Sequence, residues 1–138
     1  MPDPVVHFEM PAKDKKRTAQ FYSSVFGWHM NQLGQDMGDY LLAGSVDVDE
    51  QNMPKKSGAI NGGFFEYKDE PGYNEPHLVI SVDNLENSIK KVEEAGGEVL
   101  GGIKGKGTID EIPGVGRYVS FIDTEGNRVG MLEPLPMK

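Results

Sequence analysis

Residues 5–28 read VVHFEMPAKDKKRTAQFYSSVFGW, and residues 75–99 read EPHLVISVDNLENSIKKVEEAGGEV. The two stretches match without a gap when the chain is shifted by 70 residues. A strand histidine, a helix-capping side chain and a helix-ending glycine coincide in this alignment: His7 with His77, Asp14 with Asn84, and Gly27 with Gly97. Self-similarity that also respects the order of predicted elements indicates an internal duplication.

Each copy begins with a strand and continues with a helix. The run 4–10 contains Val and Phe and ends before a proline, and the run 77–82 is similarly rich in β-branched residues, so both favour strands. Asp14 and Asn84 are side chains that cap helix N-termini, and apolar residues recur after each at three- and four-residue steps. The pattern therefore predicts a strand followed by an amphipathic helix, twice.

The remainder of each copy is predicted to form hairpins. Gly38-Asp39-Tyr40-Leu41 resembles Gly116-Arg117-Tyr118-Val119, and polar, glycine-rich stretches at 44–57 and 101–116 read as loops, the first of them mobile. We predict one α+β domain over residues 1–138, with βαβββ modules at 1–67 and 77–138 and a linker at 68–76. Two curved mixed sheets, each with a helix on its outer face, would enclose a cleft, which is the default binding site.

Composition narrows the classes of function. The chain has 138 residues, no cysteine and a formal net charge of -8, so a disulfide framework, a zinc-thiolate site and a thiol nucleophile are excluded, and nucleic-acid binding is not supported. A membrane-spanning segment and a secretory signal are not expected, and the cytoplasm is the expected location. A small-molecule ligand fits this composition better, and pairing of two chains into a homodimer is expected because open sheet edges need cover.

Three segments carry a resemblance to a known family: 5–28, 75–99 and RYVSFIDTEGNRVGMLEP at 117–134. They are similar to the recurring segments of the vicinal oxygen chelate superfamily, which includes glyoxalases, bleomycin-resistance proteins and extradiol dioxygenases. The helix ending in FYSSVFGW and the turn DTEGN are the most specific pieces. The resemblance covers both halves of the chain and implies paired βαβββ modules around a cleft.

The resemblance also implies a place for a divalent metal. Metal-bearing members hold the ion on the first and last strand of each half, and His7 and His77 match the two first-strand positions. Two imidazoles would begin a site for Ni, Fe, Mn, Co or Zn. The last-strand position falls on Gly130, and its first-half equivalent falls near Asn61 or Gly62, so neither supplies an acid.

Further candidates follow from strand alternation. Glu9 lies two residues after His7 and should share its face, which makes it a candidate general base or substitute ligand, although a solvated strand end is an equal alternative. Glu133 lies three residues after Gly130, so it should point to the opposite face unless a bulge intervenes. Trp28, Asn61 and Tyr118 are candidate ligand contacts, with ordinary packing as the alternative for the aromatic residues.

Two functions from different classes remain open. The first is a small-molecule binding protein of the glyoxalase and bleomycin-resistance type with a degenerate metal site. The alternative is a metal-dependent glyoxalase-like lyase or dioxygenase, in which an ion on His7 and His77 polarises vicinal substrate oxygens. The missing acids favour the binding protein.

Overall fold

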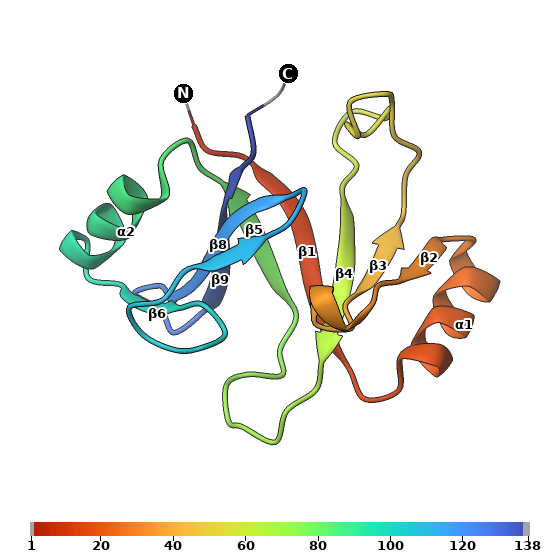
Figure 1. Cartoon of the computed structure of the whole chain (residues 1–138), viewed down its shortest axis with the longest axis horizontal. Helices are drawn as coiled ribbons and strands as arrows, with labels where there is room; N and C mark the ends of the chain where they lie inside the picture. The colour runs from red at the N-terminus through yellow and green to blue at the C-terminus, as the bar shows by residue number, and fades with distance from the viewer. Residues whose placement is uncertain (1, 137–138) are drawn as a thin grey trace. The chain divides into compact units, whose positions relative to one another are not determined.

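The computed structural model describes residues 2–136. The described chain contains nine β-strands and two α-helices, and it divides into two compact units. Residues 7–76 form one unit, and the remaining described residues form the other (Figure 1). This architecture confirms the predicted α+β class, and the element order strand, helix, strands occurs twice. Neither helix in the described chain has the length and apolar character needed to cross a membrane.

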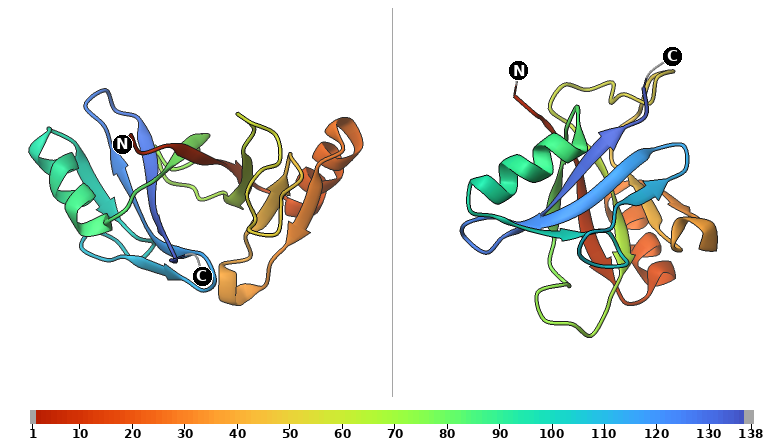
Figure 2. Two further views of the ribbon diagram at one scale, coloured as in Figure 1. Left: turned by 90° about the horizontal axis from the view of Figure 1, so that it is seen from above. Right: turned by 60° about the vertical axis from the view of Figure 1, so that its left-hand side comes forward.

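The unit of residues 7–76 carries the first copy of the repeat. Its elements are β1 (Val5–Ala12, whose first two residues group with the other unit), α1 (Lys15–Phe26), β2 (His29–Gln32), the short 3-10 helix η1 (Gln35–Met37), β3 (Leu41–Gly44) and β4 (Asn61–Glu66). Its strands pair in the order β2-β3-β4-β1, with β1 parallel to β4 and the other pairs antiparallel. Helix α1 covers one face of this sheet (Figure 2).

Local signals explain the ends of α1. Asp14 has extended backbone angles, and its carboxylate accepts a hydrogen bond from the Arg17 N–H at 3.0 Å, as an N-cap does. The helix ends at Gly27, whose φ of 70° lies in the left-handed region that favours glycine. The core beneath this helix contains Leu41 and Phe64. The sequence therefore predicted both ends of α1 correctly.

The second unit carries the second copy. Its elements are β5 (His77–Ser81), α2 (Leu85–Glu94), β6 (Glu98–Gly101), β7 (Asp110–Ile112), β8 (Gly116–Ile122) and β9 (Arg128–Pro134). The strand order is β5-β9-β8-β6, with β7 on β8, and β5 is parallel to β9. Helix α2 covers one face, above a core that includes Leu85, Val119 and Met131. Asn84 is the N-cap of α2, and its side-chain oxygen accepts a hydrogen bond from the Asn87 N–H at 2.9 Å.

Two details differ from the sequence prediction. Strand β7 lies inside the stretch 101–116, which we expected to be only a loop; its three residues pair with β8. Three consecutive residues are too few for an alternating pattern to be recognised. Helix α2 ends at Glu94, and the left-handed residue after it is Gly96, with a φ of 97°, rather than Gly97.

Candidate functional site

The sheet of the 7–76 unit has one face toward α1 and one face away from it. Phe8 packs against the core under α1. His7 and Glu9 flank Phe8 in β1, so strand alternation turns their side chains to the opposite face, which α1 does not cover and which we call the open face. Both residues are half-buried. This open face therefore carries an imidazole and a carboxylate two residues apart.

The Tyr40 hydroxyl joins these two groups. It lies 3.0 Å from His7 Nε2 and donates a hydrogen bond to Glu9 Oε2 at 2.8 Å. When the hydroxyl proton points to Glu9, the hydroxyl oxygen can accept a hydrogen bond from His7 in the tautomer whose Nε2 carries the hydrogen. Tyr40 lies in the turn before β3. Its backbone carbonyl accepts a hydrogen bond from the Leu33 N–H at 2.9 Å, and this bond fixes the position of the residue. Together His7, Tyr40 and Glu9 form a chain of polar groups, which we call the polar triad.

A glycine makes room for Tyr40. Gly63 pairs with Glu9 across β1 and β4, and a β-carbon at position 63 would overlap the Tyr40 ring. Only a residue without a side chain lets the ring lie against the backbone of β4 at this point. The neighbouring Gly62 has a similar packing reason on the other face, because a β-carbon there would lie 2.5 Å from the Phe8 ring.

The second unit repeats the same arrangement. A β-carbon at position 130 would lie 2.5 Å from the Tyr118 Oη and 2.6 Å from its Cε2, so the Tyr118 ring covers Gly130. Gly130 pairs with Val79 in β5, just as Gly63 pairs with Glu9 in β1. Tyrosine over glycine is therefore a duplicated feature of the chain. At the last-strand position, the ring occupies space into which a longer side chain would extend.

Glu133 does not replace the missing acid. Its carboxylate accepts a hydrogen bond from the Leu85 N–H at the start of α2, at 2.9 Å, and lies 3.4 Å from an Arg117 guanidinium nitrogen. These contacts place Glu133 on the helix-covered face, as strand alternation predicted, and the β8/β9 pairing runs without a register shift between Gly116 and Ile122. Arg117 also pairs with Glu86, and this hydrogen bond lowers the pKa of the Glu86 carboxyl.

Other candidates have identifiable surroundings. The Asn61 Oδ1 accepts from the Val46 N–H at 2.9 Å, so its carboxamide ties the loop after β3 to β4. Trp28 stacks on Tyr22 with a centroid distance of 4.8 Å and lies 5.6 Å from Phe8, on the side of the sheet that α1 covers. Trp28 is thus not part of the polar triad. The roles of Asn61, Trp28 and Tyr118 as ligand contacts stay predictions.

His77 is buried, with 6% of its surface exposed, at the start of β5. It belongs to the second unit and His7 to the first, and the joint binding of one ion by both stays a prediction. Tyr40 was not among the candidate site residues from the sequence. The resemblance of Gly38-Asp39-Tyr40-Leu41 to Gly116-Arg117-Tyr118-Val119, at a shift of 78 residues, was the signal that could have identified it.

A family model described as "Glyoxalase-like domain" matches residues 6–129. This chain belongs to the glyoxalase-like domain family. A "Glyoxylase-like domain-containing protein" from Didymella fabae is 30% identical over 125 residues, which cover 86% of this chain and 84% of the relative. The resemblance to the vicinal oxygen chelate superfamily inferred from the sequence is confirmed.

Solved structures share the glyoxalase-like fold at low identity. Methylmalonyl-CoA epimerase from Mycobacterium tuberculosis has a TM-score of 0.64 and 16% identity, covering 96% of this chain and 88% of that chain. A variant methylmalonyl-CoA epimerase from Streptomyces coelicolor, in complex with 2-nitronate-propionyl-CoA, has a TM-score of 0.68 and 11% identity, covering 99% and 100%. At these identities the likeness shows the fold.

At the last-strand positions, the residues of this glyoxalase-like chain offer no carboxylate to a divalent ion. Gly130 offers no donor, Glu133 accepts from the helix α2 backbone, and the Asn61 oxygen already accepts from Val46. Open metal sites use about three protein ligands, commonly with a carboxylate among them. Within residues 2–136, no group of three or more His, Asp or Glu side chains is placed to hold an ion.

Proposed function

We propose that this protein binds a small molecule on the open face of the 7–76 unit, through the polar triad of His7, Tyr40 and Glu9, without a catalytic metal. The observation that supports this proposal most directly is the Tyr118 ring over Gly130, together with the engagement of Glu133 by α2. The last-strand position is Gly130, which has no acid. The nearby acid, Glu133, points to the other face of the sheet. A carboxylate is a common ligand of open catalytic metal sites, and these two positions supply none to an ion.

The triad suggests the chemistry of the ligand. It presents a carboxylate and an imidazole, each within hydrogen-bonding distance of one phenol hydroxyl, on half-buried residues. Glu9 can accept from a ligand N–H or O–H, and the imidazole can donate to a ligand carbonyl or accept from a ligand hydroxyl. Methylmalonyl-CoA and 2-nitronate-propionyl-CoA are bound by similar solved structures, so acyl-CoA esters are one class to test.

The proposal is tested with the full-length chain purified without chelators. Elemental analysis is followed by calorimetric titration with Ni, Mn, Fe, Co and Zn, and by a thermal-shift screen of carbonyl compounds and acyl-CoA esters with and without each ion. We expect no stoichiometric metal and ligand-induced stabilisation that does not depend on added ions.

The variants His7→Ala and Tyr40→Phe locate the response. Under the proposal, Tyr40→Phe weakens ligand binding while metal content stays negligible. Stoichiometric metal that His7→Ala removes would instead establish the metal-dependent lyase or dioxygenase alternative. A ligand whose binding is unchanged by both variants would overturn the assignment to the polar triad.

A further inference from the structure

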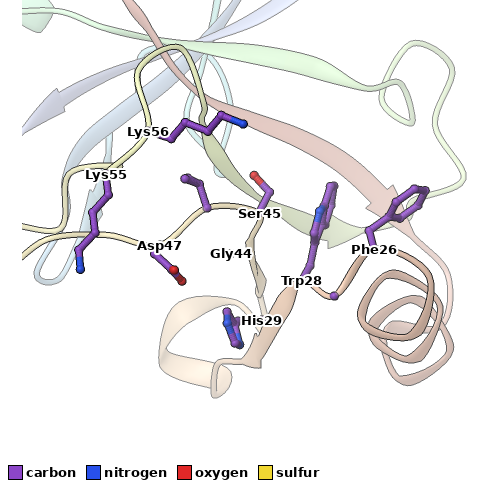
Figure 3. A pocket seen from close by; sticks show the side chains of 10 residues that line it. Phe26, Trp28, His29, Gly44, Ser45, Asp47, Lys55 and Lys56 are labelled. Carbon is purple, nitrogen blue, oxygen red and sulfur yellow. The ribbon is translucent and has the colours of Figure 1, made fainter.

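A hollow in the 7–76 unit lies outside the polar triad. It has a volume of about 500 Å³ and forms where α1 ends, β2 begins and the loop after β3 returns toward β4 (Figure 3). The residues that define its chemistry are Phe26, Trp28, His29, Asp47, Lys55 and Lys56. Sites for small organic ligands commonly enclose several hundred Å³. We call this hollow the Trp28 pocket.

The Trp28 pocket is separate from the polar triad. Trp28 packs against Phe8, on the face of the sheet that α1 covers, whereas His7 and Glu9 alternate to the open face. His7, Glu9 and Tyr40 are not among the residues that line the pocket. A ligand in this pocket would therefore not occupy the triad.

Aromatic side chains form one wall of the pocket. Trp28 is held by stacking on Tyr22, with a centroid distance of 4.8 Å, and Phe26 lies beside it with ring centroids 6.0 Å apart. Phe26 keeps 60% of its surface exposed, and Trp28 is half-buried. Exposed aromatic surface beside a hollow is suited to contact with the flat apolar part of a ligand.

The opposite wall is cationic. Lys55 and Lys56 line the pocket with a single carboxylate, that of Asp47, and the chain as a whole has a net charge of -8. Within residues 2–136, neither lysine ammonium takes part in an ion pair. Two cations concentrated beside an aromatic surface on an otherwise acidic protein favour an anionic ligand.

The loop that carries the lysines is held in place by hydrogen bonds. The Lys55 N–H donates to the Asp47 carbonyl at 2.8 Å, Val48 bridges to Pro54, and the Val46 N–H donates to Asn61 at 2.9 Å. The carboxylate of residue 49 accepts from two further backbone N–H groups within the loop. A fixed backbone reduces the entropy lost when side chains on it engage a ligand.

We propose that the Trp28 pocket binds a small organic anion that carries a flat apolar ring. The ring lies against Phe26 and Trp28, and the acid group, a carboxylate, sulfonate or phosphate, is paired by Lys55 and Lys56. His29, at the start of β2, contributes a further polar group to the pocket wall. The site is independent of the function proposed above for the polar triad.

Trp28 is the chain's single tryptophan, so its indole N–H gives one resonance in a ¹⁵N-labelled sample and reports on this pocket directly. The probe is benzenesulfonate, compared with benzyl alcohol, which has the ring without the charge, and with inorganic sulfate, which has the charge without the ring. We expect a saturable shift of the indole resonance with benzenesulfonate and a much weaker response to the other two.

The variant Lys55→Ala/Lys56→Ala should weaken benzenesulfonate binding about five- to tenfold, because each exposed ion pair contributes modestly. The matched control is Lys90→Ala/Lys91→Ala, which removes the same charge from α2, outside the pocket, and it should leave the titration unchanged. Tyr40→Phe should also leave the benzenesulfonate titration unchanged, so either proposal can be overturned without the other. A shift that does not saturate, an equal response to benzyl alcohol, or an unaltered titration in the Lys55/Lys56 variant would overturn the proposal.

Discussion

The Tyr40 hydroxyl donates a hydrogen bond to the Glu9 carboxylate at 2.8 Å, across 31 residues of sequence. The same oxygen lies 3.0 Å from the His7 imidazole. Because His7 and Glu9 come from one strand and Tyr40 from the turn before another, the contact depends on how β1, β4 and β3 pair. The triad is thus a product of sheet assembly.

Tyr40→Phe tests this contact. The change keeps the ring over Gly63 but removes the hydroxyl that joins Glu9 and His7. We expect a loss of about 1 kcal/mol in the free energy of unfolding, measured by urea denaturation, because the half-buried Glu9 carboxylate loses the hydrogen bond from Tyr40. Tyr22→Phe is the matched control, since the Tyr22 ring packs against Trp28 and the core, and its hydroxyl makes no hydrogen bond within residues 2–136. Equal effects in the two variants would contradict the prediction.

Gly130→Ala should destabilise the second unit. The new methyl group would lie 2.5 Å from the Tyr118 Oη, so the ring must move or the strands must separate, at a cost of about 1–3 kcal/mol. The cost should fall in a Tyr118→Ala background, because the clash is then absent. A double-mutant cycle by urea denaturation measures this coupling, and strictly additive effects would show that the two positions do not touch.

The Arg117–Glu86 pair predicts a pH-dependent contribution to stability. The Arg117 hydrogen bond lowers the pKa of the Glu86 carboxyl in the folded protein. A carboxyl with a depressed folded pKa contributes stability above its unfolded pKa, and loses it as the pH falls through the folded value. Arg117→Ala should therefore lower the urea midpoint more at pH 7 than at pH 2.5.

The control for this pair is Lys90→Ala, an exposed change on the same helix as Glu86, at a side chain that makes no ion pair among the described residues. Its small effect should not change with pH. An Arg117→Ala effect of equal size at both pH values would mean that the side chain stabilises by packing alone.

Gly27→Ala tests the end of α1. Gly27 has a φ of 70°, and no atom lies within 4 Å of the place that a β-carbon would take, so the cost is backbone strain alone, about 1–2 kcal/mol. Gly27→Asn should cost less, because asparagine adopts left-handed angles more readily. The two variants are compared by thermal unfolding, and equal losses would point to a cause other than backbone conformation.

The helix ends and the repeat could be predicted because their signals are local. Asp14 and Asn84 cap helices as their sequence positions suggested, and both are read within a few residues. Gly126 likewise has a positive φ, of 88°, in the predicted DTEGN turn. Strand β7 was missed because its pairing with β8, rather than its own three residues, makes it a strand.

The site was predicted only in part. Alternation placed His7 with Glu9, and Glu133 away from Gly130, since both statements concern residues of one strand. Strand alternation could not predict that Tyr40 contacts His7 and Glu9, or that two lysines line the Trp28 pocket. Their positions depend on a turn and on a loop whose hydrogen bonds are visible only in the folded chain.

The sequence by itself determined the duplicated order of elements, the caps of the helices and the face to which each strand residue points, because these depend on neighbours within a few positions. Tertiary structure alone decided that Tyr40 and Tyr118 lie over glycines of adjacent strands. That choice follows from the register of strand pairing, and a register shift of one residue would turn every side chain of a strand to the other face.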